Sequence, residues 1–290
     1  MTLIDYMANH VLAFVVVAGL LGLVIGSFLN VVIHRLPQMM ERDWLRQCRE
    51  MLEPEKPQPD QPVFNLVLPH SHCPHCQTEI KAWQNLPLIS YALLRGRCGA
   101  CQQRISPRYP LVELLTGVLS MVVAWHYGFD WPAAGVLLVT WALIALSLID
   151  ADTQLLPDSI VLPMLWLGLI ANSFGLLTDM HSALWGAIAG YLSLWSVYWL
   201  FKLITGKEGM GYGDFKLLAM LGAWGGWQVL PLTILLSSLV GTILGIIILK
   251  SRGAAHSTPL PFGPYLAIAG WIAIIWGEWI TATYLKLAGF

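Results

Sequence analysis

The stretch PAAGVLLVTWALIALSLID, from Pro132 to Asp150, carries eighteen uncharged residues and then a carboxylate. An apolar run of this length is a candidate for a helix that crosses the hydrocarbon core of a bilayer. A second carboxylate, Asp214, ends the string Gly211-Tyr212-Gly213-Asp214 and opens another apolar run. Because charges at membrane depth are costly, they tend to mark function. Two of them on segments that can face each other indicate acid–base chemistry on a water molecule.

The composition extends this interpretation to the whole chain. Of the 290 residues, 57% are apolar and only 11% are charged, whereas a soluble domain carries about a quarter charged residues. We therefore predict an all-α polytopic membrane protein with about eight transmembrane helices, surrounded by membrane lipids. The net charge of −1 gives no indication of a nucleic-acid partner. The predicted spans are residues 11–33, 111–129, 132–149, 159–178, 183–201, 215–230, 231–249 and 265–285.

The basic residues predict how these spans are oriented. The stretch 34–109 holds ten of the sixteen Lys and Arg residues, and eight spans place fifteen of the sixteen on one side. The positive-inside rule puts that side in the cytoplasm. Residues 150–158 and 202–216 fall on the same side, so Asp150 and Asp214 are both expected at the cytoplasmic face.

The chain is expected to have three parts. They are a first transmembrane helix (1–33), a large cytoplasmic loop (34–109) and a seven-helix transmembrane core (110–290). Within the loop, residues 40–62 contain four prolines among charges, which is typical of an irregular linker. Residues 70–108 carry the cysteines and are expected to form a small domain inserted between the first two helices.

Four of the five cysteines form two C-x-x-C pairs, Cys73/Cys76 and Cys98/Cys101, separated by twenty-one residues. This spacing is typical of two metal-binding knuckles and predicts a zinc-ribbon-like domain. Four thiolates close a tetrahedral site, so the metal is expected to be structural zinc. A domain of about 40 residues has too small a core to fold unaided, which gives the metal a purpose. The remaining thiol, Cys48, is not expected to bind the metal. Near the first cysteine pair, His70, His72 and His75 are alternative ligands.

The carboxylates near Asp150 need to be separated by role. Asp150 directly ends the apolar run and is favoured over Asp152, which lies in a polar loop. Asp158 follows Pro157 and precedes an apolar run, so helix capping accounts for it without function. Asp214 has a structural alternative as well, as a capping residue in a glycine turn. The glycines on both sides of Tyr212 favour a functional role for Asp214, because glycine lets a substrate approach the backbone closely.

At this point the motifs resemble those of the type IV prepilin peptidase/N-methyltransferase family. The matching stretches are GSFLNVVIHRLP (26–37), HCPHC (72–76), NLPLISY (85–91), RCGAC (97–101), ISPRYPLVELLT (105–116), the Asp150 stretch, GYGDFK (211–216) and PFGPYLA (261–267). The resemblance implies an aspartic peptidase of the G-x-G-D class, with Asp150 and Asp214 as its catalytic pair. It implies prepilins and pseudopilins as substrates in the bacterial inner membrane, and methylation of the new N-terminus with S-adenosylmethionine as donor.

Two other functions fit parts of the pattern. Intramembrane carboxylates also occur in ion- or proton-coupled transporters, and a zinc-ribbon scaffold without catalysis would leave both aspartates dispensable. The residues alone give no binding site for the methyl donor, because no glycine-rich nucleotide fingerprint follows a strand. We expect the donor to bind the domain around residues 70–110, the largest folded surface predicted in the cytoplasm.

Overall fold

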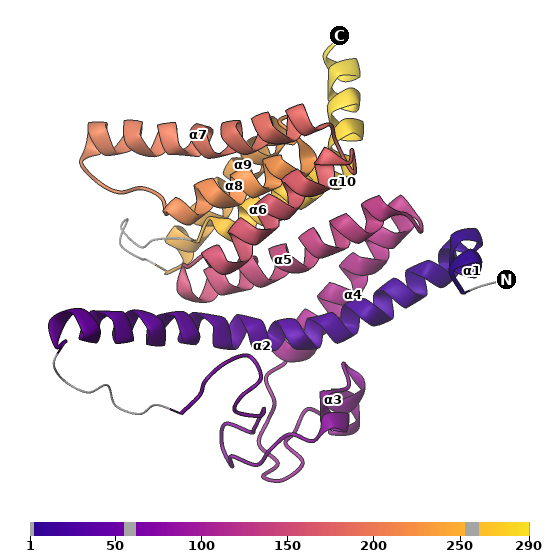
Figure 1. The fold of residues 1–290 in the computed structure, drawn as a ribbon, viewed down its shortest axis with the longest axis vertical. Coiled ribbons are helices and arrows are strands. Elements are labelled where there is room, and N and C mark those ends of the chain that lie inside the picture. The colour runs from indigo at the N-terminus through magenta and orange to yellow at the C-terminus, as the bar shows by residue number, and fades with distance from the viewer. Residues whose placement is uncertain (1–2, 55–61, 253–260, 290) are drawn as a thin grey trace. The chain divides into compact units, whose positions relative to one another are not determined.

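The computed structural model describes residues 3–54, 62–252 and 261–289, and within them the chain is helical, with no extended strand (Figure 1). It forms two compact units, Met1–Phe129 and Asp130–Phe290. The first unit contains α1 (Leu3–Asn9), α2 (Val11–Leu52), the 3-10 helix η1 (Ala82–Asn85), α3 (Ile89–Leu93) and α4 (Arg108–Tyr127). The second contains α5 (Trp131–Thr153), α6 (Asp158–Ser173), α7 (Met180–Thr205), α8 (Tyr212–Gly225), α9 (Val229–Arg252) and α10 (Gly263–Ala288).

The first unit is organised around the packing of α2 against α4. Gly22 and Gly26, four residues apart, lie on the contact face: a side chain at Gly22 would meet the Thr116 carbonyl at 2.8 Å, and one at Gly26 would meet the backbone of Glu113 at 2.7 Å. Small residues at this spacing let two helices approach closely, as is common in membranes. The residues between α2 and α4 carry the cysteines, and we call residues 70–108 the cysteine domain.

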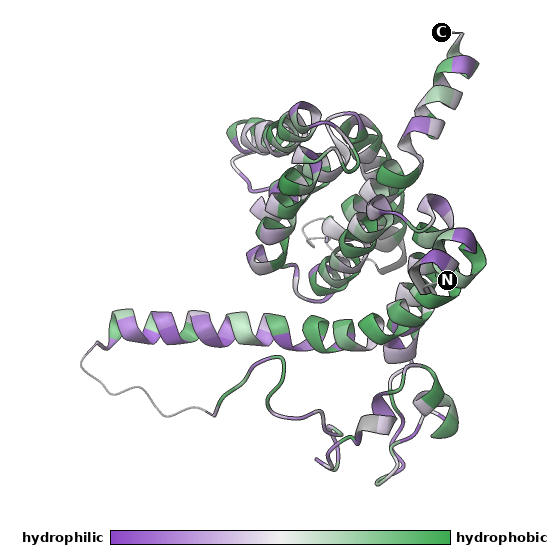
Figure 2. Cartoon of the chain, turned by 45° about the vertical axis from the view of Figure 1, so that its right-hand side comes forward, coloured by the Kyte–Doolittle hydropathy of each residue, from purple (hydrophilic) through white to green (hydrophobic). Residues whose placement is uncertain are grey.

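The prediction of an irregular linker over residues 40–62 is wrong for its first part, because α2 continues as a helix to Leu52. Residues 38–52 contain neither Gly nor Pro and are rich in Met, Glu, Arg and Leu, which are good helix formers. Figure 2 shows the change along α2 from a mainly apolar first half to a mixed, polar second half. Residues 55–61 of the predicted linker lie outside the described residues.

The second unit is built around the short helix α8, which packs against α6, α7, α9 and α10. From Asp214 to Trp224 every residue of α8 except Lys216 is buried. Two glycines explain how close α7 comes: a side chain at Gly186 would overlap the carbonyl of Gly222, and a side chain at Gly222 would overlap the carbonyl of Gly186. α8 therefore lies enclosed in the unit, with its N-terminal turn carrying Asp214.

The side chain of Asn172 in α6 forms hydrogen bonds with the backbone carbonyls at the C-terminal end of α8. Its side-chain amide donates to the carbonyls of Ala223 and Trp224 at 2.8 and 2.9 Å, and its oxygen accepts from the backbone of Leu177 and Thr178. A helix end leaves carbonyls without intrahelical partners, and burying them unsatisfied is costly. One buried side chain thus lets α8 stop after 14 residues.

Five of the described helices are long and apolar enough to cross a membrane: α2, α4, α5, α7 and α10. α6 and the described part of α9 up to Leu244 are apolar but shorter. Each of the eight predicted spans overlaps a helix, but the span 159–178 runs past the end of α6 at Ser173, and the span 215–230 runs past the end of α8 at Gly225 into α9. α8 extends only about 21 Å at 1.5 Å per residue, which is less than the ~30 Å hydrocarbon core.

Candidate active site and candidate metal centre

Asp150 lies in the last turn of α5 and is only 5% exposed. Its Oδ2 accepts a hydrogen bond of 2.9 Å from the backbone N–H of Gly263, the first residue of α10. A side chain at position 263 would lie 2.7 Å from that oxygen, so only glycine allows the approach. The sequence reasoning missed Gly263 as a site residue, although the motif PFGPYLA in which it lies was the available signal.

Asp214 lies in the first turn of α8 and is 7% exposed. Its carboxyl group is close enough to that of Asp150 for the two to interact electrostatically. A side chain at the neighbouring Gly213 would meet Cβ of Leu156 at 2.8 Å, so this glycine lets the loop after α5 pack against the start of α8. The structure thus brings together the two aspartates that the sequence singled out, on different helices.

The other two aspartates of the α5–α6 region lie elsewhere. Asp152 is exposed. The prediction that Asp158 caps a helix is wrong, because Pro157 occupies the capping position of α6. Asp158 instead accepts from Nζ of Lys216, at 2.8 Å to Oδ1 and 2.7 Å to Oδ2. This ion pair joins the first turn of α6 to α8, two residues beyond Asp214.

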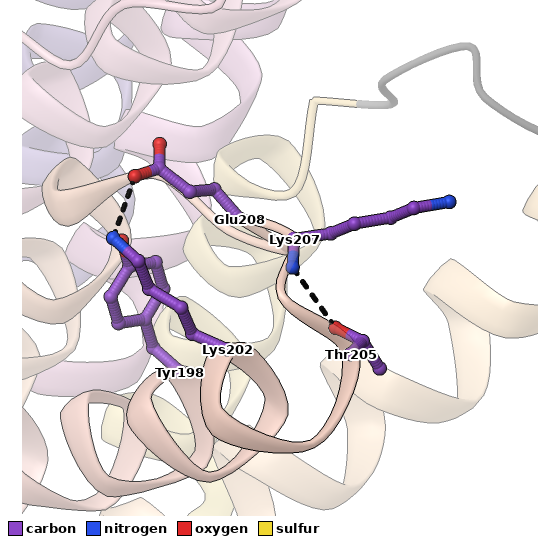
Figure 3. A network of polar contacts seen from close by, with 5 residues as sticks. All are labelled: Tyr198, Lys202, Thr205, Lys207 and Glu208. Atoms are coloured by element: carbon purple, nitrogen blue, oxygen red, sulfur yellow. Dashed lines mark hydrogen bonds and ion pairs between the residues drawn. The ribbon is translucent and has the colours of Figure 1, made fainter.

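The loop between α7 and α8 is tied back to α7 by a polar network (Figure 3). Lys202 Nζ donates to Glu208 Oε1 at 2.8 Å and to the Tyr198 hydroxyl at 3.2 Å. The Lys202 ammonium holds the pKa of the Glu208 carboxyl below its ordinary value. The buried ring of Tyr198 packs against Tyr212 and Phe215, with centroids 5.2 and 5.6 Å apart. These contacts hold the loop and the first turn of α8, which carries Asp214, against α7.

The two cysteine pairs form knuckles of the same local geometry. In the first, Cys73 N–H donates to Thr78 and a bridge pairs His72 with Glu79. In the second, Cys98 N–H donates to Gln103 and a bridge pairs Arg97 with Arg104. The residue after each pair, Gln77 and Gln102, has a φ of 58° and 59°. This repeated turn points both thiols of each pair to one side.

The four sulfurs lie within 4.8 Å of one another, and two pairs, Cys73–Cys101 and Cys76–Cys98, are 3.8 and 3.9 Å apart. Tetrahedral zinc with Zn–S bonds of about 2.3 Å separates its sulfurs by about 3.8 Å, so the donor set and its spacing fit zinc. Hydrogen bonds to the Thr78 hydroxyl, 3.3 Å from Cys76 Sγ, and to the Thr78 backbone lower the pKa of that thiol to about 6, whereas burial and the neighbouring thiols raise the pKa of Cys101 to about 11. Among the described residues this group contains no histidine, and Cys48 is exposed on α2.

A basic cavity of about 590 Å³ opens in the cysteine domain beside the second knuckle. Its lining residues are Tyr91, Arg95, Gly96, Arg97, Arg104, Ile105, Ser106 and Pro107. Gly96 has a φ of +67°, and a side chain there would press on the Tyr91 hydroxyl at 2.9 Å. Three exposed arginines are among the lining residues, and arginine suits a ligand that carries a carboxylate or phosphate.

Comparison with known proteins gives a consistent result. Two family models match: the bacterial peptidase A24 N-terminal domain over residues 20–127, and the type IV leader peptidase family over residues 137–246. A prepilin leader peptidase/N-methyltransferase of Pseudomonas aeruginosa is 67% identical over all of both chains, and one of Pseudomonas putida is 59% identical over all of both. A protein of the same name from Neisseria gonorrhoeae is 52% identical over 88% of each chain. No solved structure gives a significant match.

Proposed function

Since the chain belongs to the type IV leader peptidase family, we propose that it is a membrane-embedded aspartic endopeptidase and N-methyltransferase acting on prepilins. The observation that carries the proposal is the pair of buried carboxylates, Asp150 and Asp214, brought together at the ends of two helices in an apolar unit. The names of the relatives supply the substrate class. Pseudopilins, which resemble prepilins, are further expected substrates.

The proposed cleavage uses one water molecule and both carboxyl groups. Two carboxylates close together do not both ionise easily, so one keeps its proton and polarises the scissile carbonyl. The other takes a proton from the attacking water. The N–H of Gly263 holds the Asp150 carboxyl in one orientation, and the glycine at 213 holds the loop after α5 against α8. Both contacts reduce the freedom of the dyad before the substrate binds.

The site is proposed to face the cytoplasm of a bacterium, at its inner membrane. The excess of Lys and Arg in residues 34–109 supports this orientation, and the eight spans predicted from the sequence would put both aspartates on that side. A prepilin then presents a short basic leader in the cytoplasm and an apolar helix in the bilayer. The scissile bond between them meets the dyad at the membrane surface.

Zinc is proposed to bind Cys73, Cys76, Cys98 and Cys101, where it would hold the two knuckles together. It has no step in the chemistry, because four protein thiolates leave no open coordination position. The cysteine domain has few buried apolar residues among those described. Without the metal, a domain of this size lacks the buried surface to stay folded.

The methyl donor, S-adenosylmethionine, is proposed to bind the basic cavity of the cysteine domain. The volume of about 590 Å³ lies in the usual range for small-molecule sites. Arg95, Arg97 and Arg104 would hold its carboxylate, and the Tyr91 ring offers a face to its cationic sulfonium. When bound, it supplies an electrophilic methyl group, while this chain orients the donor and the new N-terminal amine.

One experiment tests both activities together. Purified protein in detergent is incubated with a prepilin, and the substrate mass is followed with and without S-adenosylmethionine. The expected result is loss of the leader in both cases and a later gain of one methyl group only with the donor. A transporter or an inert scaffold would leave the prepilin mass unchanged, and the comparisons give neither alternative support, because each relative carries a peptidase name.

A further inference from the structure

The cysteine domain and the residues before it are fastened to the two long helices of the first unit by side chains that bond to backbone groups. α2 supplies two of these side chains and α4 one. They are Ser27 to the Asn85 carbonyl (3.4 Å), Arg35 to the Asn65 and Pro69 carbonyls (2.9 and 2.6 Å) and Glu113, which accepts from the Leu88 N–H at 2.9 Å. A third α2 side chain, Asn30, donates to the Tyr109 carbonyl at the start of α4 (3.1 Å). The motif GSFLNVVIHRLP on α2 therefore supplies side chains that bind the backbone of the segment between α2 and α4.

Arg35 is the strongest of these attachments. It is 8% exposed, and its two terminal nitrogens donate to two different carbonyls of one turn, residues 65–69. That turn has its own internal order: the Asn65 side chain accepts from the backbone of Val67 and Leu68 at 2.8 and 2.7 Å. A planar guanidinium presents two donors in a fixed fork, which a lysine ammonium does not reproduce.

Apolar burial does not hold this turn in place. Val63 and Val67 are 67% and 71% exposed, and Leu68 is exposed as well. The ring of Phe64 packs against two arginines rather than in an apolar core. The guanidinium of Arg42 lies 3.8 Å from the ring centroid, and that of Arg35 lies 5.8 Å from it. The turn is therefore held against α2 by the hydrogen bonds of Arg35 and by the stacking of Arg42 on Phe64, and it leads within four residues into the first cysteine, Cys73.

We propose that Arg35 is a positioning residue for methyl transfer, because its grip on residues 65–69 fixes the cysteine domain against α2. The inference rests on the proposed function, which places the methyl donor in the cavity of that domain. Rigid attachment keeps the cavity in one position against α2, so that it presents the methyl donor to the substrate amine in one orientation. Asp150 and Asp214 belong to the second unit, so cleavage does not depend on this grip.

The test uses the full-length protein in detergent with two substrates, an intact prepilin and a pilin supplied already cleaved. Variants are Arg35→Lys, Arg35→Gln and Asn65→Ala, which loosens the same turn from its other side. Arg46→Gln is the matched control, because Arg46 is exposed on the same helix and forms an exposed ion pair with Asp43, three residues away. Methylation kcat, KM for the donor, cleavage rate and zinc content are measured for each.

In Arg35→Gln, methylation kcat is expected to fall on the order of 10²-fold, the size of loss that a misplacement of about 1 Å produces. KM for the donor, zinc content and the cleavage rate should stay within about twofold, because only the placement of the cavity changes. Arg35→Lys should lie between. Asn65→Ala should lose methylation in the same way, and combining it with Arg35→Gln should add little, as expected for two parts of one contact.

Full methylation by Arg35→Gln and by Asn65→Ala, with wild-type methylation intact, overturns the proposal. Equal losses of cleavage, zinc and methylation overturn it as well, since they show a general folding role. If Arg35→Gln does not accumulate, Asn65→Ala decides alone by the same criteria. Absence of methylation in the wild-type protein defeats the proposed function itself, and the inference with it.

Discussion

The backbone N–H of Gly263 donates a hydrogen bond to Oδ2 of Asp150, 113 positions earlier in the chain, at 2.9 Å. The contact joins the end of α5 to the first residue of α10. Since the N-terminus of a helix carries partial positive charge, α10 favours a carboxylate at this place. One aspartate of the proposed dyad is thus oriented by the main chain of a third helix.

Gly263→Ala is expected to reduce prepilin cleavage by about tenfold or more, because a displaced carboxyl group loses its alignment with the water and the substrate. The added Cβ would lie 2.7 Å from Asp150 Oδ2, and either the aspartate or the start of α10 must move. Gly277→Ala is the control in the same helix, since its nearest neighbour lies 3.9 Å away. Cleavage rates of the two purified variants are compared, and equal rates contradict the role given to Gly263.

Gly186→Ala is expected to lower the free energy of unfolding by about 1–3 kcal/mol, the usual cost of overfilling a packed interface. The added methyl would overlap the backbone of Gly222, and backbone cannot rotate away as a side chain does. Gly241→Ala in α9 meets its neighbours at 3.4 Å or more and should leave stability nearly unchanged. Thermal unfolding in detergent measures both, and a smaller loss in Gly186→Ala than in Gly241→Ala contradicts the packing account.

The purified protein is expected to contain one zinc ion per chain. Replacing Cys73, Cys76, Cys98 or Cys101 with Ser should remove it, because each thiolate closes one corner of the tetrahedron. Cys48→Ser should keep the metal, since Cys48 lies on α2 away from the cluster. Elemental analysis of freshly purified samples is the measurement. An active wild-type protein without zinc rules out a required metal.

The ion pair between Lys202 and Glu208 is expected to stabilise the α7–α8 loop only above mildly acidic pH. Lys202 holds the folded-state pKa of Glu208 below its ordinary value of 4.5. The contribution is therefore present above the unfolded-state pKa and is lost as the pH falls through the lowered one. The Tm difference between wild type and Glu208→Gln should be present at neutral pH, shrink in acid and shrink with added salt. A difference that does not change with pH contradicts this account.

The sequence revealed Asp150 and Asp214 because carboxylates interrupt apolar runs and stand out there. It revealed the four cysteines because their spacing is local, and each knuckle closes within eight residues. Gly263 could not be found in this way, because its contribution is a backbone N–H, which every residue except proline has. The motif PFGPYLA marks the stretch in which it lies, but its role follows from the fold, which brings residues 113 positions apart together.

Two errors have a common cause. The prolines at 54, 57, 59 and 62 extended the linker prediction back into residues 40–52, although these residues are good helix formers and continue α2. Asp158 was interpreted from its local neighbours as a helix cap, whereas its partner, Lys216, lies 58 positions away on α8. Local patterns identify helices well, but they do not show which charged groups meet across them.

The central claim is that Asp150 and Asp214 together cleave the substrate, and the most direct measurement is prepilin cleavage by purified single variants. Asp150→Asn and Asp214→Asn should each lose cleavage by about 10²–10⁴-fold, the usual contribution of a positioned acid or base, while keeping zinc and methylating a substrate already cleaved. Asp152→Asn is the control, because Asp152 is exposed two residues from Asp150. Loss of cleavage in Asp152→Asn with activity retained in Asp150→Asn would contradict the account.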